Sequence, residues 1–232
     1  LNSANRPAIG TGDAFLNQNL FTTNGAGRRQ TGFVVDGSTG LELWGRQTIF
    51  TSLPVDSLQE MTVLTNAFSA EYGAGVGSVV NIVSRTGGNN YHGSVIGVLR
   101  PAALTAQLSR GGNAASGTQI RSDYLKQFAA TLGGPIGESG NTHFFLDGEY
   151  SWQNRTSPVT SAIAPGNFVG HYRGWLGFAR LDHRFSDRNN AFLRLGADSF
   201  RDTNPSGAVG GNSLPSVGRI FRRRTYTTEV GE

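Results

Sequence analysis

Side chains that could catalyse a reaction or bind a metal are scattered through this sequence of 232 residues. The sequence has no cysteine, which excludes disulfides, thiolate nucleophiles and cysteine-based metal sites. The four histidines do not form the His-x3-His or His-Glu-x-x-His pairs of a zinc site; they are His92, His143, His171 and His183. The glycine-rich run at 73–77 precedes a predicted strand, whereas a dinucleotide-binding loop follows one. We therefore predict no enzymatic activity, no cofactor and no metal.

Charged side chains are the other candidates, and their excess is basic, with 20 Lys and Arg against 16 Asp and Glu. The arginines are spread along the chain, mostly one at a time. Compact runs occur at 28–29 and 222–224, without the interleaved aromatic residues of a single-strand nucleic-acid site. This distribution argues against nucleic acid as a partner. The run at 222–224 is predicted to be a solvated loop end or the start of a strand.

Many of the charges occupy every second position of three segments, at 143–153, 175–185 and 191–198. Apolar residues occupy the positions between them, so each segment is predicted to be a β-strand with one apolar and one charged face. The charged faces carry Asp147, Glu149, Arg180, Asp182, Arg184, Arg194 and Asp198. The opposite faces carry the aromatic residues Phe144, Tyr150, Trp152 and Trp175, which are candidates for lipid contact.

The connections between these strands differ in length. Short turns are predicted at 134–140 and 186–190, and long connections at about 101–122, 154–173 and 201–221. Outer-membrane β-barrels have short periplasmic turns and long extracellular loops. A soluble antiparallel sandwich would show the same alternation but has no reason to sort its connections by length. The pattern therefore favours a membrane β-barrel.

The first ninety residues have a different pattern. A strand at 33–35 runs into an Asp-Gly turn, and a helical turn after Pro54 leads into a strand at 58–64. Residues 67–72 are compatible with another short helical turn, and 78–84 reads as a further strand. We expect a small mixed α/β unit.

Several blocks of this unit, taken in order, resemble the plug domain of TonB-dependent outer-membrane receptors. They are Phe33-Val34-Val35-Asp36-Gly37, the segment 53–64, Ala70-Glu71-Tyr72-Gly73 and the segment 77–87. The segments 89–94 and 132–136 resemble the first barrel strands of the subgroup that carries a carboxypeptidase-regulatory-like domain before the plug. The common plug pattern continues into a Gly-Pro pair where this chain has Thr65-Asn66-Ala67, which is typical of that subgroup.

The resemblance implies a mixed α/β plug followed by antiparallel transmembrane strands of a barrel that has about twenty-two strands in full. After residue 92, about 140 residues remain, which is enough for about six strands of ~10 residues and too few for the ~8 strands of the smallest barrels. We therefore expect a fragment, with the plug domain at 1–90 and the first five to six barrel strands at 91–232.

The function implied by the resemblance is TonB-dependent active transport of a scarce substrate across the outer membrane of a Gram-negative bacterium. The plug would gate the barrel lumen. The implied partners are a TonB-type energy-coupling protein, acting through a segment outside this sequence, outer-membrane lipid, and a nutrient substrate that the sequence does not identify. The alternatives are a passive porin or adhesin-like barrel, against which the plug blocks argue, and a soluble β-rich binding module, which would need no outward apolar face.

A movable plug needs polar contacts with its wall, because charged, wet contacts exchange with water whereas a buried apolar interface would be costly to separate. The charged strand faces given above fit a lumen lining. On the plug, we expect Asp36, Glu60 and Arg85 to anchor it to the wall and glycines to allow tight turns. The full set of expected plug site residues is Asp36, Gly37, Glu60, Tyr72, Gly73, Gly77, Asn81 and Arg85.

Overall fold

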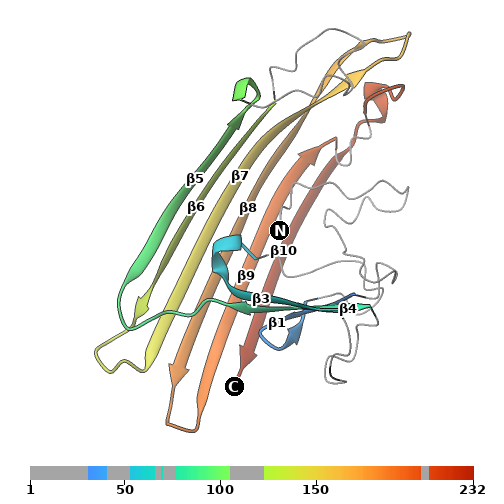
Figure 1. Ribbon diagram of the computed structural model, residues 1–232. Helices are drawn as coiled ribbons and strands as arrows, with labels where there is room; N and C mark the ends of the chain where they lie inside the picture. Colours follow the sequence, from blue (N-terminus) through green and yellow to red (C-terminus); the bar gives the residue numbers. More distant parts are fainter. Residues whose placement is uncertain (1–30, 41–52, 66–68, 70–76, 105–122, 205–208) are drawn as a thin grey trace.

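Two β-sheets make up the described part of the chain (Figure 1). The structure is a computed structural model that describes residues 31–40, 53–65, 69, 77–104, 123–204 and 209–232. In this part the chain is almost entirely β-strand, joined by short 3-10 turns. No helix in the described ranges is long and apolar enough to span a membrane.

The small sheet has four strands in the order β2-β1-β4-β3. They are β1 (Thr31–Val35), β2 (Ser38–Thr39), β3 (Leu58–Leu64) and β4 (Ser78–Ser84). β1 pairs parallel with β4, and the other two pairings are antiparallel. Its core is formed by four apolar side chains, with Leu53 and Leu58 packed against them: Phe33, Val35, Val80 and Ile82.

The helical part of the predicted α/β unit is reduced, in the described residues, to a single 3-10 turn η2 (Val55–Ser57), which leads directly into β3. Pro54 precedes this turn, and the Ser57 hydroxyl donates a hydrogen bond of 2.7 Å to the Pro54 carbonyl. The α-helical character is therefore not confirmed. The second expected helical turn, at 67–72, falls almost entirely outside the described residues.

The large sheet has six strands that pair antiparallel in chain order (Figure 1). They are β5 (His92–Pro101), β6 (Tyr124–Pro135), β7 (Thr142–Val159), β8 (Gly166–Arg184), β9 (Asn190–Thr203) and β10 (Ile220–Gly231). A 3-10 turn η4 (Ala102–Leu104) follows β5, and η6 (Pro215–Val217) precedes β10.

Two of these strands are much longer than the sequence pattern predicts. β7 has 18 residues and β8 has 19, and they remain paired up to Val159 and Gly166. The long connection predicted at 154–173 is therefore wrong, because only residues 160–165 lie between the two strands. Residues 154–159 and 166–173 include many polar residues, Gly and Pro, which are typical of loops. In the structure they extend the pairing of β7 with β8.

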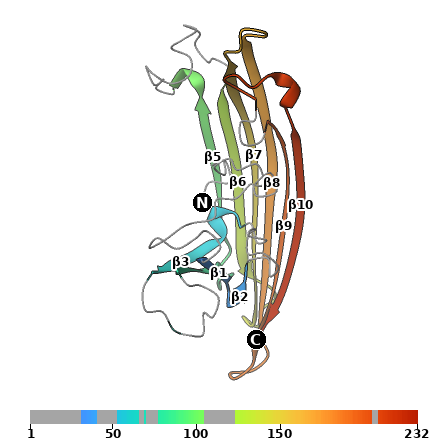
Figure 2. The same ribbon diagram turned by 90° about the vertical axis from the view of Figure 1, so that its right-hand side faces the viewer.

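The predicted alternation of side chains is present on β7. Asp147 and Glu149 are buried on one side of the strand, whereas Leu146, Tyr150 and Trp152 are exposed on the other. We call the first side of the large sheet its inner face and the second its outer face. The small sheet lies beside the inner face, as its contacts with Arg180 and Arg194 show (Figure 2).

The small sheet is located toward the end of the large sheet that carries the short turns at 136–141 and 185–189 (Figure 1). Residues 85–91 connect it to β5. Within this connection, Gly87 lies so close to β7 that an added Cβ would be 2.3 Å from the Phe144 carbonyl oxygen.

The Gly87→Ala substitution is therefore predicted to lower the free energy of unfolding by about 1–3 kcal/mol, because overpacking forces backbone shifts. The measurement is urea unfolding followed by tryptophan fluorescence. Gly148→Ala is the matched control, since a Cβ at Gly148 meets no atom within 4 Å. Equal stability of the Gly87 and Gly148 variants would contradict this account of the close contact.

Candidate functional site

The β1–β2 turn places a carboxylate at the tip of the small sheet. Asp36 and Gly37 form the turn, with φ angles of 48° and 91°. Aspartate is one of the few residues with a side chain that tolerate positive φ, and Asp-Gly is a preferred pair for tight hairpins. The Asp36 amide donates a hydrogen bond of 2.9 Å to the Ile82 carbonyl, which holds the turn against β4.

The Asp36 carboxylate is held within the small sheet by Ser84, the last residue of β4. The Ser84 amide donates to Oδ1 and the Ser84 hydroxyl to Oδ2, each at 2.8 Å. Sequence reasoning missed Ser84. The only signal available was its position at the end of a predicted strand, which does not reveal a partner 48 residues away.

Two arginines of the large sheet complete the surroundings of Asp36. Arg194 Nη1 donates to Oδ2 at 2.6 Å, and Arg180 Nη1 lies 3.3 Å from Oδ1. Arg180 and Arg194 are themselves directly opposite each other on β8 and β9. Like charges in directly opposite positions destabilise a sheet, so the carboxylate between them offsets their repulsion.

The contact is buried, with 4% of the Asp36 side chain exposed and 11% and 6% of Arg180 and Arg194. Burial by itself would raise the pKa of the Asp36 carboxyl. The hydrogen bonds from Ser84 and the positive charges of the two arginines outweigh burial, and the pKa lies below its usual range.

Further polar residues extend this contact in both directions. Arg180 also binds Asp182 through Nε and Nη2, and its Nη1 donates to the Ser84 hydroxyl at 2.8 Å. Arg194 pairs with Glu229 of β10. Ser38 on the small sheet donates to Glu229 Oε1 at 2.7 Å. We call the whole set the Asp36 cluster: Asp36, Ser38, Ser84, Arg180, Asp182, Arg194 and Glu229.

A second contact between the sheets involves η2, which touches β6 and β7. Asp147 points there from β7, and both of its carboxylate oxygens are buried without a hydrogen-bond partner among the described residues. The charges of Asp56 and Glu149 repel this carboxylate, whereas Arg85 attracts it. Among the described residues, no ion pair joins the two sheets at this second contact, unlike at the Asp36 cluster.

The other expected plug residues are distributed differently. Glu60 is exposed, and its carboxylate accepts a hydrogen bond from Thr62 of its own strand instead of reaching the large sheet. The reason is that β3 is an edge strand with most of its side chains exposed. Arg85 donates through Nε to the Leu58 carbonyl. Asn81 lies half-buried in β4, Gly77 is buried just before it, and Tyr72 and Gly73 lie outside the described residues.

The expected lumen residues outside the cluster also differ from one another. Asp198 is buried and accepts hydrogen bonds from Nε and Nη2 of Arg223 on β10. Glu149 accepts a hydrogen bond from Ser151. Arg184, at the end of β8, is exposed and donates to the Asn141 side chain. Glu229 and Arg223 were missed, although they share one side of β10, where alternation would have revealed them once the strand was recognised.

Replacing Asp36 by asparagine is predicted to lower the free energy of unfolding by about 3–5 kcal/mol, because two directly opposite buried arginines would lose the carboxylate that lies between them. Asparagine tolerates the same positive φ, so the effect reports the lost charge. Urea unfolding measures it. Asp187→Asn, in the exposed turn after β8, is the control and is expected to change stability by less than about 0.5 kcal/mol.

The low pKa of Asp36 also predicts a pH dependence. Its stabilising contribution is complete above the ordinary carboxyl pKa of ~4 and is lost as the pH falls through the lower folded-state value. The stability difference between the wild type and Asp36→Asn should therefore be constant from pH 5 to 8 and shrink below pH ~4. A difference that persists unchanged to pH 2 would contradict the assignment.

Comparison with known proteins gives similarity in sequence and in fold. No protein-family model matches the chain. The TonB-dependent transporter Oar of Myxococcus xanthus is 35% identical over 117 residues, which are 49% of this chain and 11% of that protein. The chain thus aligns with about a tenth of the length of this curated relative.

Among solved structures, the siderophore receptor PirA of Acinetobacter baumannii is similar with a TM-score of 0.53 at 16% identity. This match covers 76% of the present chain and 25% of the receptor. A mutant of the ferric enterobactin receptor PfeA of Pseudomonas aeruginosa, in complex with enterobactin, gives a TM-score of 0.54 at 18% identity, covering 88% and 31%. The resemblance to TonB-dependent receptors is therefore confirmed, and the β-rich fold matches theirs.

Proposed function

We propose that this chain is part of a TonB-dependent transporter of the outer membrane of a Gram-negative bacterium. In this proposal, residues 1–90 belong to a plug and residues 91–232 form the first five to six strands of a wall of about twenty-two strands. The similarity to a TonB-dependent transporter in sequence and to siderophore receptors in fold supports it. The position of the small sheet beside the inner face of the large sheet agrees with a plug inside a barrel (Figure 2).

The observation that carries the transport proposal is the Asp36 cluster. The small sheet is joined to the large sheet there by hydrogen bonds and ion pairs of Asp36 with Arg180 and Arg194. Such a contact has a large penalty when one partner is removed in a dry site, yet each charge is well solvated once water reaches it. The plug is therefore firmly closed at rest and separable when it is pulled.

Energy for that separation would come from a TonB-type coupling protein that pulls on a segment outside the described residues. As the β1–β2 turn moves away, Asp36 leaves the two arginines and water enters between the sheets. Arg194 keeps Glu229 as a partner and Arg180 keeps Asp182, so neither arginine is left without a counter-charge. The two arginines of the wall would therefore have a carboxylate partner both when the plug is in place and when it has moved away. The substrate in this proposal is a scarce nutrient.

The two alternatives differ from the transport proposal in different features of the molecule. A passive porin would conduct without the movement of a plug. A soluble β-rich binding module would not need the row of exposed apolar side chains on the outer face, which includes Leu146, Trp175 and Leu195.

A reversible cross-link across the cluster tests whether the plug must move. Ser38 and Glu229 lie on the two sheets with their side-chain oxygens 2.7 Å apart, and the chain has no native cysteine. In the complete transporter with Ser38→Cys and Glu229→Cys, a short bis-methanethiosulfonate reagent, which forms a reducible disulfide with each cysteine and releases methanesulfinate, is expected to lower energised uptake at least about tenfold. Reduction should restore uptake, and each single-cysteine variant should be insensitive to the reagent.

Uptake is measured with a labelled panel of ferric siderophores, cobalamin, glycans and peptides, in cells with and without the coupling protein. Unchanged uptake after cross-linking would remove the gating role of this contact. Equal uptake without the coupling protein would favour the porin alternative. Release of the protein from membranes without detergent would favour the soluble module.

A further inference from the structure

The outer face of the large sheet carries a row of cations for which the transport proposal has no use. The strand registers place one outward residue from each of five consecutive strands side by side. The row consists of Lys126, Trp152, Arg173, Arg201 and Arg222. At ~4.8 Å per strand, it extends over about 19 Å of the surface. Lys126, Arg201 and Arg222 are exposed, and Arg173 is partly exposed.

Within the described residues no carboxylate balances the charges in this row, and Arg173 Nη1 donates only to the main-chain carbonyls of Gln153 and Tyr172. Arg173, Arg201 and Arg222 are directly opposite one another on neighbouring strands, an arrangement that destabilises a sheet. None of the four cations forms an ion pair with a carboxylate in the described ranges of the chain. All carboxylates of these strands lie at inner-face positions: Asp147, Glu149, Asp182, Asp198, Asp202 and Glu229.

This balance differs from that of the inner face, where the opposed pair Arg180 and Arg194 encloses the carboxylate of Asp36. By the same reasoning, an outer row of three opposed arginines requires an anion from outside the protein. Arginine is well suited to this role, because its planar guanidinium binds phosphate through two parallel hydrogen bonds.

Aromatic rings beside the row indicate where its cations lie relative to the apolar interior of a membrane. Trp152 lies between two cations, with Lys126 Nζ 5.4 Å and the Arg173 guanidinium carbon 4.2 Å from its ring centroid. The next register level contains Phe128, Tyr150 and Trp175, all exposed. Aromatic belts with basic residues beside them mark the level of lipid headgroups on membrane proteins.

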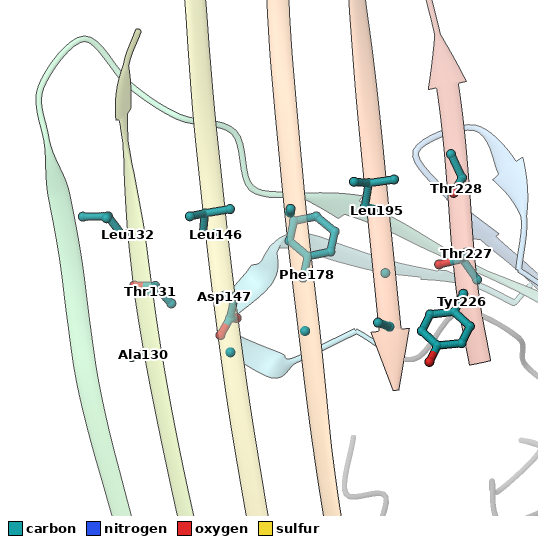
Figure 3. Close-up of a pocket in the computed structure, with 15 residues that line it drawn as sticks. Ala130, Thr131, Leu132, Leu146, Asp147, Phe178, Leu195, Tyr226, Thr227 and Thr228 are labelled. Carbon is teal, nitrogen blue, oxygen red and sulfur yellow. The ribbon is translucent and has the colours of Figure 1, made fainter. Parts of the chain in front are cut away.

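Next to the aromatic level, an apolar groove of about 610 Å³ crosses the outer face (Figure 3). Its floor has small residues at one register level, namely Ala130, Gly148, Gly177 and Ala197, and no atom lies within 4 Å of a Cβ built on Gly148. Figure 3 shows Leu132, Leu146 and Leu195 at one level along the border of the groove, with β8 between Leu146 and Leu195. Gly148 and Trp152 are four residues apart on β7, which corresponds to about 13 Å.

We propose that this surface binds a membrane lipid with a phosphate-bearing headgroup. The phosphate contacts Arg173, Arg201 and Arg222, and an acyl chain passes the aromatic level into the groove. The groove makes a lipid the occupant in preference to a free anion, because a soluble phosphate would have no use for the apolar surface that continues from the row. The inference rests on the proposed membrane location of the large sheet.

The test uses the complete transporter in nanodiscs that contain equal amounts of phosphatidylglycerol and phosphatidylcholine. One of the two lipids carries a photoactivatable diazirine on its acyl chain, and mass spectrometry maps the labelled residues. The phosphatidylglycerol probe is expected to label outer residues around Gly148 and Leu195 at least about fivefold more than the phosphatidylcholine probe does. Localised labelling separates this surface from the rest of the barrel.

Arg201→Gln with Arg222→Gln is expected to lower that preference to less than about twofold, because two of the cations that attract the anionic headgroup are removed. Arg201→Lys with Arg222→Lys should keep most of it. The control, Arg184→Gln with Arg188→Gln, removes the same charge at the opposite end of β8 and should leave labelling unchanged.

Equal labelling by both probes in the wild type, or an unchanged preference in the double glutamine variant, would overturn the lipid site and leave the transport proposal intact. A protein that does not enter nanodiscs and is extracted without detergent would overturn both. A variant that fails to insert is recognised by the same extraction assay, and the double lysine variant then decides the question through the contrast between the two probes.

Discussion

The arrangement of the two sheets depends on one electrostatic constraint, the placement of Arg180 directly opposite Arg194 on neighbouring strands. The pair repels within the large sheet and is tolerated because a carboxylate from a distant part of the chain lies between its members. The positive φ of Asp36, the Ser84 hydrogen bonds and the Ser38–Glu229 contact all place that carboxylate in position. Docking of the small sheet thus adds a third carboxylate, between the two arginines, to the Asp182 and Glu229 partners that the large sheet itself supplies.

The large sheet separates its charges by face. Carboxylates and the arginines that pair with them occupy inner positions, where they pair with one another and, for Arg180 and Arg194, with Asp36 of the small sheet. Outer positions hold cations, aromatic rings and small or aliphatic side chains, with no carboxylate among the described strands. Because side chains alternate strictly along each strand, a single backbone serves two unlike environments.

Much of this separation could be predicted from the sequence, because a period of two is visible in the residues themselves. Alternation identified the charged faces of β7, β8 and β9, and the Asp-Gly pair identified the turn before β2. Alternation determines on which face of the sheet a side chain lies. It does not determine which distant residue the side chain meets, so the contact between Arg194 and Asp36, 158 residues apart, could not be predicted. Glu60, expected as an anchor, lies for the same reason on the exposed edge strand β3, where it accepts a hydrogen bond from Thr62. Strand lengths were underestimated because hydrogen bonding, which sequence does not display, continues through polar residues.

The connection between β4 and β5 has a kinetic consequence. Only residues 85–91 separate the two sheets in the chain, a tether that spans at most about 25 Å when extended. A small sheet that has left its place would therefore remain at an effective concentration in the millimolar range relative to Arg180 and Arg194. Recapture would then be an intramolecular event, faster than any encounter with a second molecule, and under the transport proposal each opening would be brief unless the pulling force were maintained.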